Sequence, residues 1–137
     1  MHSAQKIRDE NDMLVTKRPK YLNLFQIRLP LPGLVSILHR ISGFGMFVFA
    51  WAILWLFQMT LESPDSYLKV MDYAQSRVVK LFLIGMSWAF LHHFFAGLRF
   101  LLLDIDVGTG LSSARRTSWA VLALSIAGTL LVGTMIW

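Results

Sequence analysis

The feature that most restricts the fold is the stretch Val78–Asp104, which is apolar enough to cross a bilayer and yet contains His92, His93 and Arg99. Even on a lenient insertion scale, a charged side chain at the centre of a membrane helix costs about 2.5–3.5 kcal/mol. Such groups therefore usually face a protein interior, a water-filled cavity or a cofactor. The hypothesis that follows is that this helix holds a cofactor.

The composition places the whole chain in a membrane. Its 137 residues are 55% hydrophobic, and the mean hydropathy is +0.56, which is too apolar for an ordinary soluble domain. The net charge of +5 comes from basic residues that flank apolar blocks, a distribution that suits lipid headgroups better than nucleic acid. The sequence has no cysteine, which excludes disulfides, thiolate iron–sulfur ligation and thiol catalysis. Any metal chemistry must then use histidine.

Three apolar segments predict an all-α fold with three transmembrane helices at about residues 34–60, 78–103 and 117–137, which together form one membrane anchor domain over 34–137. Residues 1–33 are expected to form a cytoplasmic arm and an interfacial segment, in which Pro30 and Pro32 oppose a regular helix. The polar connection 61–77 contains a turn pattern at Ser63 and Pro64. Three helices leave too little surface to enclose both a haem and a quinone, so a domain that binds them is expected to be part of a heteromeric membrane helix bundle.

The distribution of basic residues predicts the topology. Arg115 and Arg116 lie between the second and third spans, the first loop mixes both charge signs, and no basic residue follows the third span. Six more basic residues precede the first span: Lys6, Arg8, Lys17, Arg18, Lys20 and Arg28. The positive-inside rule then places the N-terminus in the cytoplasm and the C-terminus in the periplasm of a bacterial inner membrane.

His93 is the first candidate cofactor ligand. At helical spacings it shares a face with Met86, Phe90, Gly97 and Phe100, which would offer apolar walls and a gap beside the imidazole. A porphyrin requires these features together with a neutral imidazole on its iron. The alternative is a histidine that bonds to the backbone or a hydroxyl of another helix.

The neighbouring His92 points about 100° away from His93 on a helix. A structural or hydrogen-bonding role is the favoured interpretation for it, with an outer-sphere or ligand role as the alternative. Zinc is disfavoured because adjacent histidines diverge and no cysteine or carboxylate joins them.

A second polar group lies in the first turns of the first span. Ser36, His39 and Arg40 are spaced to share a helix face, and Gly43 continues that face. They could be simple interfacial residues, with Arg40 reaching lipid phosphates. They could also bind the carboxylates of a haem or the carbonyl oxygens of a quinone. A serine–histidine hydrolase is a weak alternative, since no acid orients the histidine.

Two motifs resemble a known family. One is Arg18-Pro19 followed by LNLFQIRLPLPGLVSILHRISG, and the other is HFFAGLRFLLLD from His93. Their order and separation resemble the cytochrome b subunit of succinate dehydrogenase, the larger of the two small membrane anchor subunits of respiratory complex II. The resemblance implies a partner anchor subunit, an iron–sulfur subunit and a flavoprotein that oxidises succinate. A quinol:fumarate reductase anchor and a non-redox membrane scaffold remain alternatives.

The resemblance also implies roles for individual residues. His93 matches the axial ligand of haem b, which would be shared with the partner anchor subunit. Ser36 and Arg40 match the ubiquinone-binding serine and arginine, and His39 with Arg40 matches groups near the haem propionates. Leu24 and Leu29 match positions in the wall of the quinone pocket, a weaker correspondence.

Two positions depart from the family pattern. Phe100 stands where some relatives have a second histidine, and His92 stands where close relatives can have tyrosine. The first departure removes a possible partner for a propionate or a proton, and the second makes the ligand assignment less clean. The second axial ligand would come from His39, His92 or, as the resemblance suggests, a histidine of the companion subunit.

Overall fold

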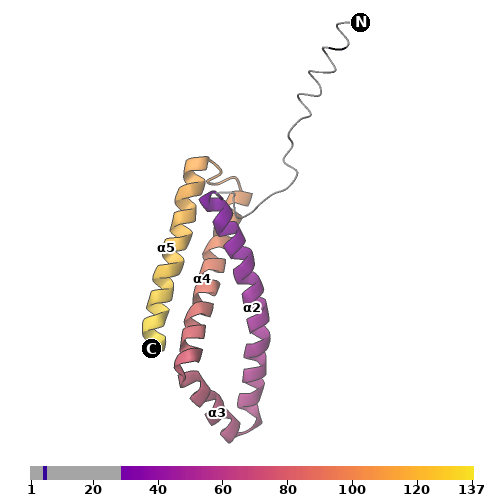
Figure 1. The fold of residues 1–137 in the computed structure, drawn as a ribbon, viewed down its shortest axis with the longest axis vertical. Helices are drawn as coiled ribbons and strands as arrows, with labels where there is room; N and C mark the ends of the chain where they lie inside the picture. The colour runs from indigo at the N-terminus through magenta and orange to yellow at the C-terminus, as the bar shows by residue number, and fades with distance from the viewer. Residues whose placement is uncertain (1–4, 6–28) are drawn as a thin grey trace.

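The computed structural model describes Gln5 and residues 29–137, and this part of the chain is helical without any strand. Three long helices, α2 (Leu31–Glu62), α4 (Arg77–Asp104) and α5 (Leu111–Ile136), are long and apolar enough to cross a membrane. A shorter helix, α3 (Pro64–Gln75), connects α2 to α4 (Figure 1). These helices confirm the predicted all-α, three-span architecture. The predicted N-terminal arm lies outside the described residues up to residue 28.

Helix α2 begins at Leu31, earlier than predicted, with Pro32 inside its first turn. A proline is compatible with this position because the first N–H groups of a helix have no intrahelical acceptor and the fixed φ angle of proline suits a helix start. Pro30 precedes the helix as its extended N-cap residue. The two prolines therefore set the start of α2 and do not exclude a helix from this segment.

Helix α3 occupies the connection in which the sequence analysis identified only a turn. Ser63 caps it, because the Ser63 hydroxyl accepts a hydrogen bond from the Ser66 N–H over 3.1 Å. Pro64 is the first helical residue, and Asp65 places a negative charge in the first turn, where the helix dipole favours it. In Figure 1, α2 and α4 lie close together at the start of α2 and diverge toward α3.

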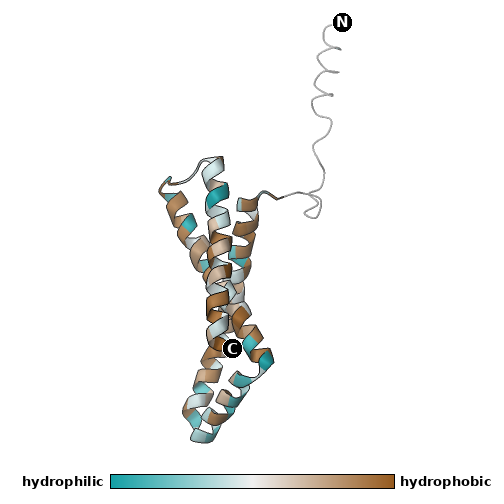
Figure 2. Cartoon of the chain, turned by 90° about the vertical axis from the view of Figure 1, so that its left-hand side faces the viewer, coloured by the Kyte–Doolittle hydropathy of each residue, from teal (hydrophilic) through white to brown (hydrophobic). Residues whose placement is uncertain are grey.

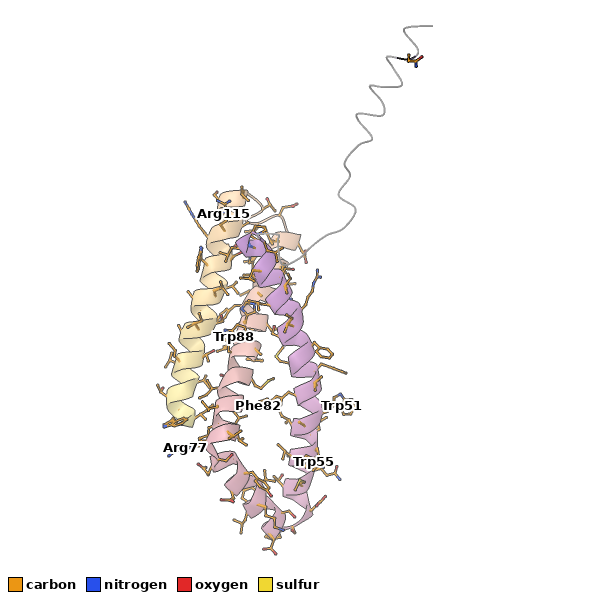
Figure 3. All side chains as sticks on the ribbon, in the orientation of Figure 1. Trp51, Trp55, Arg77, Phe82, Trp88 and Arg115 are labelled. Atoms are coloured by element: carbon orange, nitrogen blue, oxygen red, sulfur yellow. The ribbon has the colours of Figure 1, made fainter. Side chains whose placement is uncertain are left out.

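The bundle has a small core and a broad apolar exterior. Val35 of α2, Ala96 of α4 and Val121 of α5 form the buried apolar cluster where the three helices meet. Elsewhere large apolar side chains point outward, including Trp51 and Trp55 on α2 (Figure 3). Hydrophilic residues concentrate at the α3 end and at the opposite helix termini (Figure 2). Outward apolar side chains between polar ends are the arrangement expected of a multi-pass membrane protein.

Candidate functional site

Two histidines from different helices meet in the half of the bundle where α2 begins and α4 ends. The imidazole rings of His39 on α2 and His93 on α4 stack with their centroids 4.0 Å apart and their planes 12° from parallel. The Phe100 ring contacts His39 edge-on at 5.2 Å. One residue from each of the two polar clusters that the sequence analysis located on separate helices therefore takes part in this contact.

Hydrogen bonds at His93 define its tautomer. Nδ1 of His93 lies 3.0 Å from the backbone oxygen of His39. A carbonyl oxygen can only accept, so Nδ1 carries the proton and, in a neutral ring, the lone pair belongs to Nε2. Ser42 Oγ donates to the same carbonyl over 2.9 Å and lies 3.4 Å from Nδ1. The ring is thus held at one nitrogen and available for coordination at the other, which is how most metal-ligating histidines are oriented.

Gly43 allows this close approach of α4 to α2. A Cβ atom at position 43 would lie 2.8 Å from Cε1 and 3.1 Å from Nδ1 of His93, closer than a real side chain tolerates. The absence of a side chain at this position is therefore required for the His93 imidazole to reach the backbone of α2. The first-span glycine singled out from the sequence receives a side chain of the neighbouring helix.

The face of His93 differs in part from the sequence-based expectation. The space next to Gly97 contains the His39 ring, whose Nε2 would lie 3.5 Å from an added Cβ. Met86 and Phe90 instead line an apolar cavity of about 340 Å³ between α2 and α4, together with Met46 and Phe49. Phe90 precedes His93 by about one turn, so this cavity begins beside the histidine pair.

His92 has a different environment. Its side chain is 0% exposed, and neither ring nitrogen forms a hydrogen bond of standard geometry with a described residue, although the ring lies near the backbone of Val35 on α2. Its ring stacks on Trp88, one turn earlier in α4, with a centroid separation of 5.2 Å. The enclosure of His92 leaves no path for an external ligand, whereas His93 is only partly buried.

The remaining candidate residues are more dispersed. Ser36 is partly buried and Arg40 is exposed, one turn apart on α2, and neither forms a side-chain hydrogen bond or ion pair with another described residue. Leu29 is exposed immediately before α2. Leu24 lies outside the described residues. The structure thus separates His39, which turns to α4, from Arg40, which faces outward.

The donor set has the chemistry that a haem iron requires, but the described part of the chain offers one ligand and not two. The His39 ring stacks on the ring of His93 in van der Waals contact, which leaves no space for an iron and a macrocycle between them. His92 is enclosed on another face. No cluster of three or more histidine, cysteine or acidic side chains occurs among residues 29–137. Residues 29–137 therefore provide no second histidine on the iron-binding side of His93.

Sequence reasoning did not identify Ser42 as a site residue. It is buried, and its hydroxyl helps to hold the carbonyl that bonds His93. Its spacing of three residues from His39 was visible in the sequence. Its role depends on the crossing of α2 and α4, which local spacing does not contain.

Comparison with known proteins adds independent information. Residues 15–132 match the family described as succinate dehydrogenase/fumarate reductase transmembrane subunit. Proteins named succinate dehydrogenase cytochrome b556 subunit are similar to this chain. The one from Rickettsia felis is 31% identical over 119 residues, which cover 87% of this chain and 93% of that protein. The one from Coxiella burnetii is 30% identical over 122 residues, covering 88% and 98%. The one from Paracoccus denitrificans is 31% identical over 109 residues, covering 80% and 84%.

Proposed function

Because this chain belongs to the family of succinate dehydrogenase and fumarate reductase transmembrane subunits, we propose that it binds haem b and quinone in the membrane anchor of a succinate:quinone oxidoreductase. It is a non-autonomous subunit of that enzyme complex. The partners are a second anchor subunit, an iron–sulfur subunit that delivers electrons and a flavoprotein that oxidises succinate. The N-terminus faces the cytoplasm and the C-terminus the periplasm.

The observation that carries the haem assignment is the orientation of His93. Its Nδ1 is fixed by the His39 carbonyl, which leaves the Nε2 lone pair for iron. When bound, haem b supplies a one-electron carrier within the membrane. His93 would hold the iron from this chain, the Ser42 hydroxyl and the His39 carbonyl would orient its imidazole, and a histidine of the partner anchor subunit would be the second ligand.

Quinone binding is assigned to Ser36 and Arg40. They lie one turn apart on α2, and Arg40 is exposed and forms no ion pair with the described residues. A hydroxyl and a guanidinium can donate hydrogen bonds to the quinone oxygens and stabilise the negative charge that develops on reduction. Leu24 and Leu29 would contribute to the wall of the same pocket.

An optical spectrum of the purified complex tests the haem assignment. The dithionite-reduced complex should show a b-type absorption band. A complex that contains all its subunits but lacks this band would instead favour a scaffold whose histidines only pack against neighbouring helices.

Two substitutions test the quinone assignment. Ser36→Ala and Arg40→Leu should each reduce quinone turnover at least about tenfold, as expected when a charge-assisted hydrogen bond is lost. Succinate oxidation by a soluble dye should continue in both. Unchanged quinone turnover in both variants would contradict the assignment.

The family description includes fumarate reductases, so a quinol:fumarate reductase anchor is the second candidate. The names of the similar curated proteins favour succinate oxidation. The ratio of succinate oxidation to fumarate reduction in the purified complex distinguishes the two directions.

A further inference from the structure

A second polar site lies on the face of α4 that turns away from the histidine pair. Arg99 is 6% exposed, and its Nε donates a hydrogen bond to Thr117 Oγ1 on α5 over 3.1 Å. Thr117 Oγ1 in turn lies within hydrogen-bonding distance of the backbone oxygens of Ser113 and Ala114. The partners of the guanidinium on this side are therefore neutral.

The positive charge of Arg99 has no counter-charge within the described part of the chain. The guanidinium lies 5.4 Å from the Phe100 ring centroid, and no ion pair joins it to Asp104 or Asp106, both exposed at the end of α4. Its terminal amino groups form no hydrogen bond with the described residues. A desolvated guanidinium that has no counter-charge among the described residues is a strong site for an anion.

These donors line a pocket. A cavity of about 230 Å³ between α4 and α5 has Arg99, Ser113 and Thr117 among its lining residues. Most of the remaining lining is apolar, including Phe95, Leu98 and Leu124. The cavity therefore combines a cationic, hydroxyl-bearing end with an apolar surface that follows the two helices.

The start of α5 adds to the attraction for an anion. Its N-cap residue is Gly110, which provides no side chain to cap the first N–H groups, and Ser113 lies in the first turn. Uncapped N–H groups and the helix dipole favour negative charge at this end. The helix terminus and the buried guanidinium thus favour the same kind of ligand.

We propose that this pocket binds a phospholipid, whose phosphate diester accepts hydrogen bonds from the terminal amino groups of Arg99 and from the Ser113 hydroxyl, and whose acyl chain lies against Phe95, Leu98 and Leu124. Phosphate alone would satisfy the donors and leave the apolar surface uncovered. A phospholipid matches both the cationic end and the apolar surface of the pocket. The site does not depend on the haem or quinone assignments, because it lies between α4 and α5.

Native mass spectrometry of the intact complex tests the proposal. After detergent exchange, the wild-type complex should retain one phospholipid per copy of this chain, and Arg99→Gln should lower this occupancy about tenfold or more. Arg116→Gln is the matched control, because Arg116 is an exposed arginine of α5 that does not line the pocket, and it should retain the lipid. Absence of the lipid from wild type, or equal occupancy in Arg99→Gln, would overturn the proposal.

A second measurement identifies the source of the phosphate and covers the case in which Arg99→Gln fails to assemble. Phenylglyoxal should modify Arg99 in the delipidated complex, and phosphatidylglycerol vesicles should slow the modification. Ala120→Phe, which fills the apolar part of the pocket, should abolish protection by vesicles while the optical spectrum stays unchanged. Equal protection by inorganic phosphate would show a free-anion site and overturn the lipid assignment. Reactivity that no added phosphate alters would overturn the site itself.

Discussion

His92 and His93 are neighbours in the sequence, but α4 places them in opposite situations. His93 faces α2, bonds the His39 carbonyl through Nδ1 and remains partly accessible. His92 is enclosed in the bundle, stacks on Trp88 and forms no hydrogen bond of standard geometry with a described residue at either nitrogen. The rotation of about 100° per residue along a helix is sufficient to place His93 against α2 with one nitrogen open, while His92 packs inside the bundle.

This contrast shows which property of a membrane histidine indicates a cofactor. Deep burial does not indicate a cofactor, because His92 is the more deeply buried of the two histidines and no external ligand can reach it. A buried polar group without a well-formed hydrogen bond costs up to about 1–3 kcal/mol, and the contacts of His92 with the Trp88 ring and the Val35 backbone offset part of that cost. A ring fixed at one nitrogen and open at the other, as in His93, is the feature suited to coordination.

The largest expected effect is the difference between two leucine substitutions. His93→Leu should abolish or strongly shift the b-type band of the reduced complex, because the iron loses its ligand from this chain. His92→Leu should leave the band unchanged. The reversed result, with the band lost only in His92→Leu, would invert the comparison between the two faces.

Two glycines offer a matched test of the contact that positions His93. Gly43→Ala places a methyl group 2.8 Å from the imidazole and should cost about 1–3 kcal/mol of overpacking strain, measured as a lower thermal midpoint for haem loss. Gly97→Ala meets His39 Nε2 at an ordinary 3.5 Å and should change the midpoint much less. Equal effects at both positions would mean that His93 does not depend on the Gly43 contact.

His92→Leu should also raise stability, in contrast to every substitution on the His93 face. Leucine fills a similar volume without leaving polar atoms unpaired, so the gain should be about 1 kcal/mol. The thermal midpoint of subunit dissociation measures it. A loss of stability would indicate that His92 has a partner in the assembled complex.

The smallest effect is expected at Ser42. Ser42→Ala removes one of the two side-chain donors to the His39 carbonyl and retains the bond from His93, so the cost should be about 0.5–1.5 kcal/mol. Redox titration should show a small shift in the haem midpoint potential with the b-type band intact. Complete loss of the band would mean that the hydroxyl, and not the carbonyl, fixes the imidazole.

The three spans could be predicted from the sequence because hydropathy is a local property. Helix α3 could also have been predicted, because Ser63, Pro64 and Asp65 suit the start of a helix as well as a turn. The sequence analysis considered only the turn. Helix α5 begins at Leu111, before the predicted residue 117, and so it includes Arg115 and Arg116. The sequence analysis missed this start because the polar first turns have no apolar periodicity to mark it.

The site was predictable in part. Helix geometry alone predicts that the side chains of His92 and His93 point in different directions. It also places Ser36 and Arg40 one turn apart on α2. The stacking of His39 on His93 and the role of Ser42 depend on how α2 crosses α4. A crossing is set by long-range packing, which one sequence read locally does not determine.

Helix α3 has a mechanical consequence for the apolar cavity between α2 and α4. Its 12 residues span about 18 Å, whereas packed helices approach to 8–10 Å between their axes. Because α3 is longer than this distance, it can keep the end of α2 and the start of α4 apart. At the opposite end of these helices, Gly43 permits the close approach of α2 and α4. The cavity lined by Met46, Phe49, Met86 and Phe90 lies between α2 and α4, toward the end at which α3 joins the two helices.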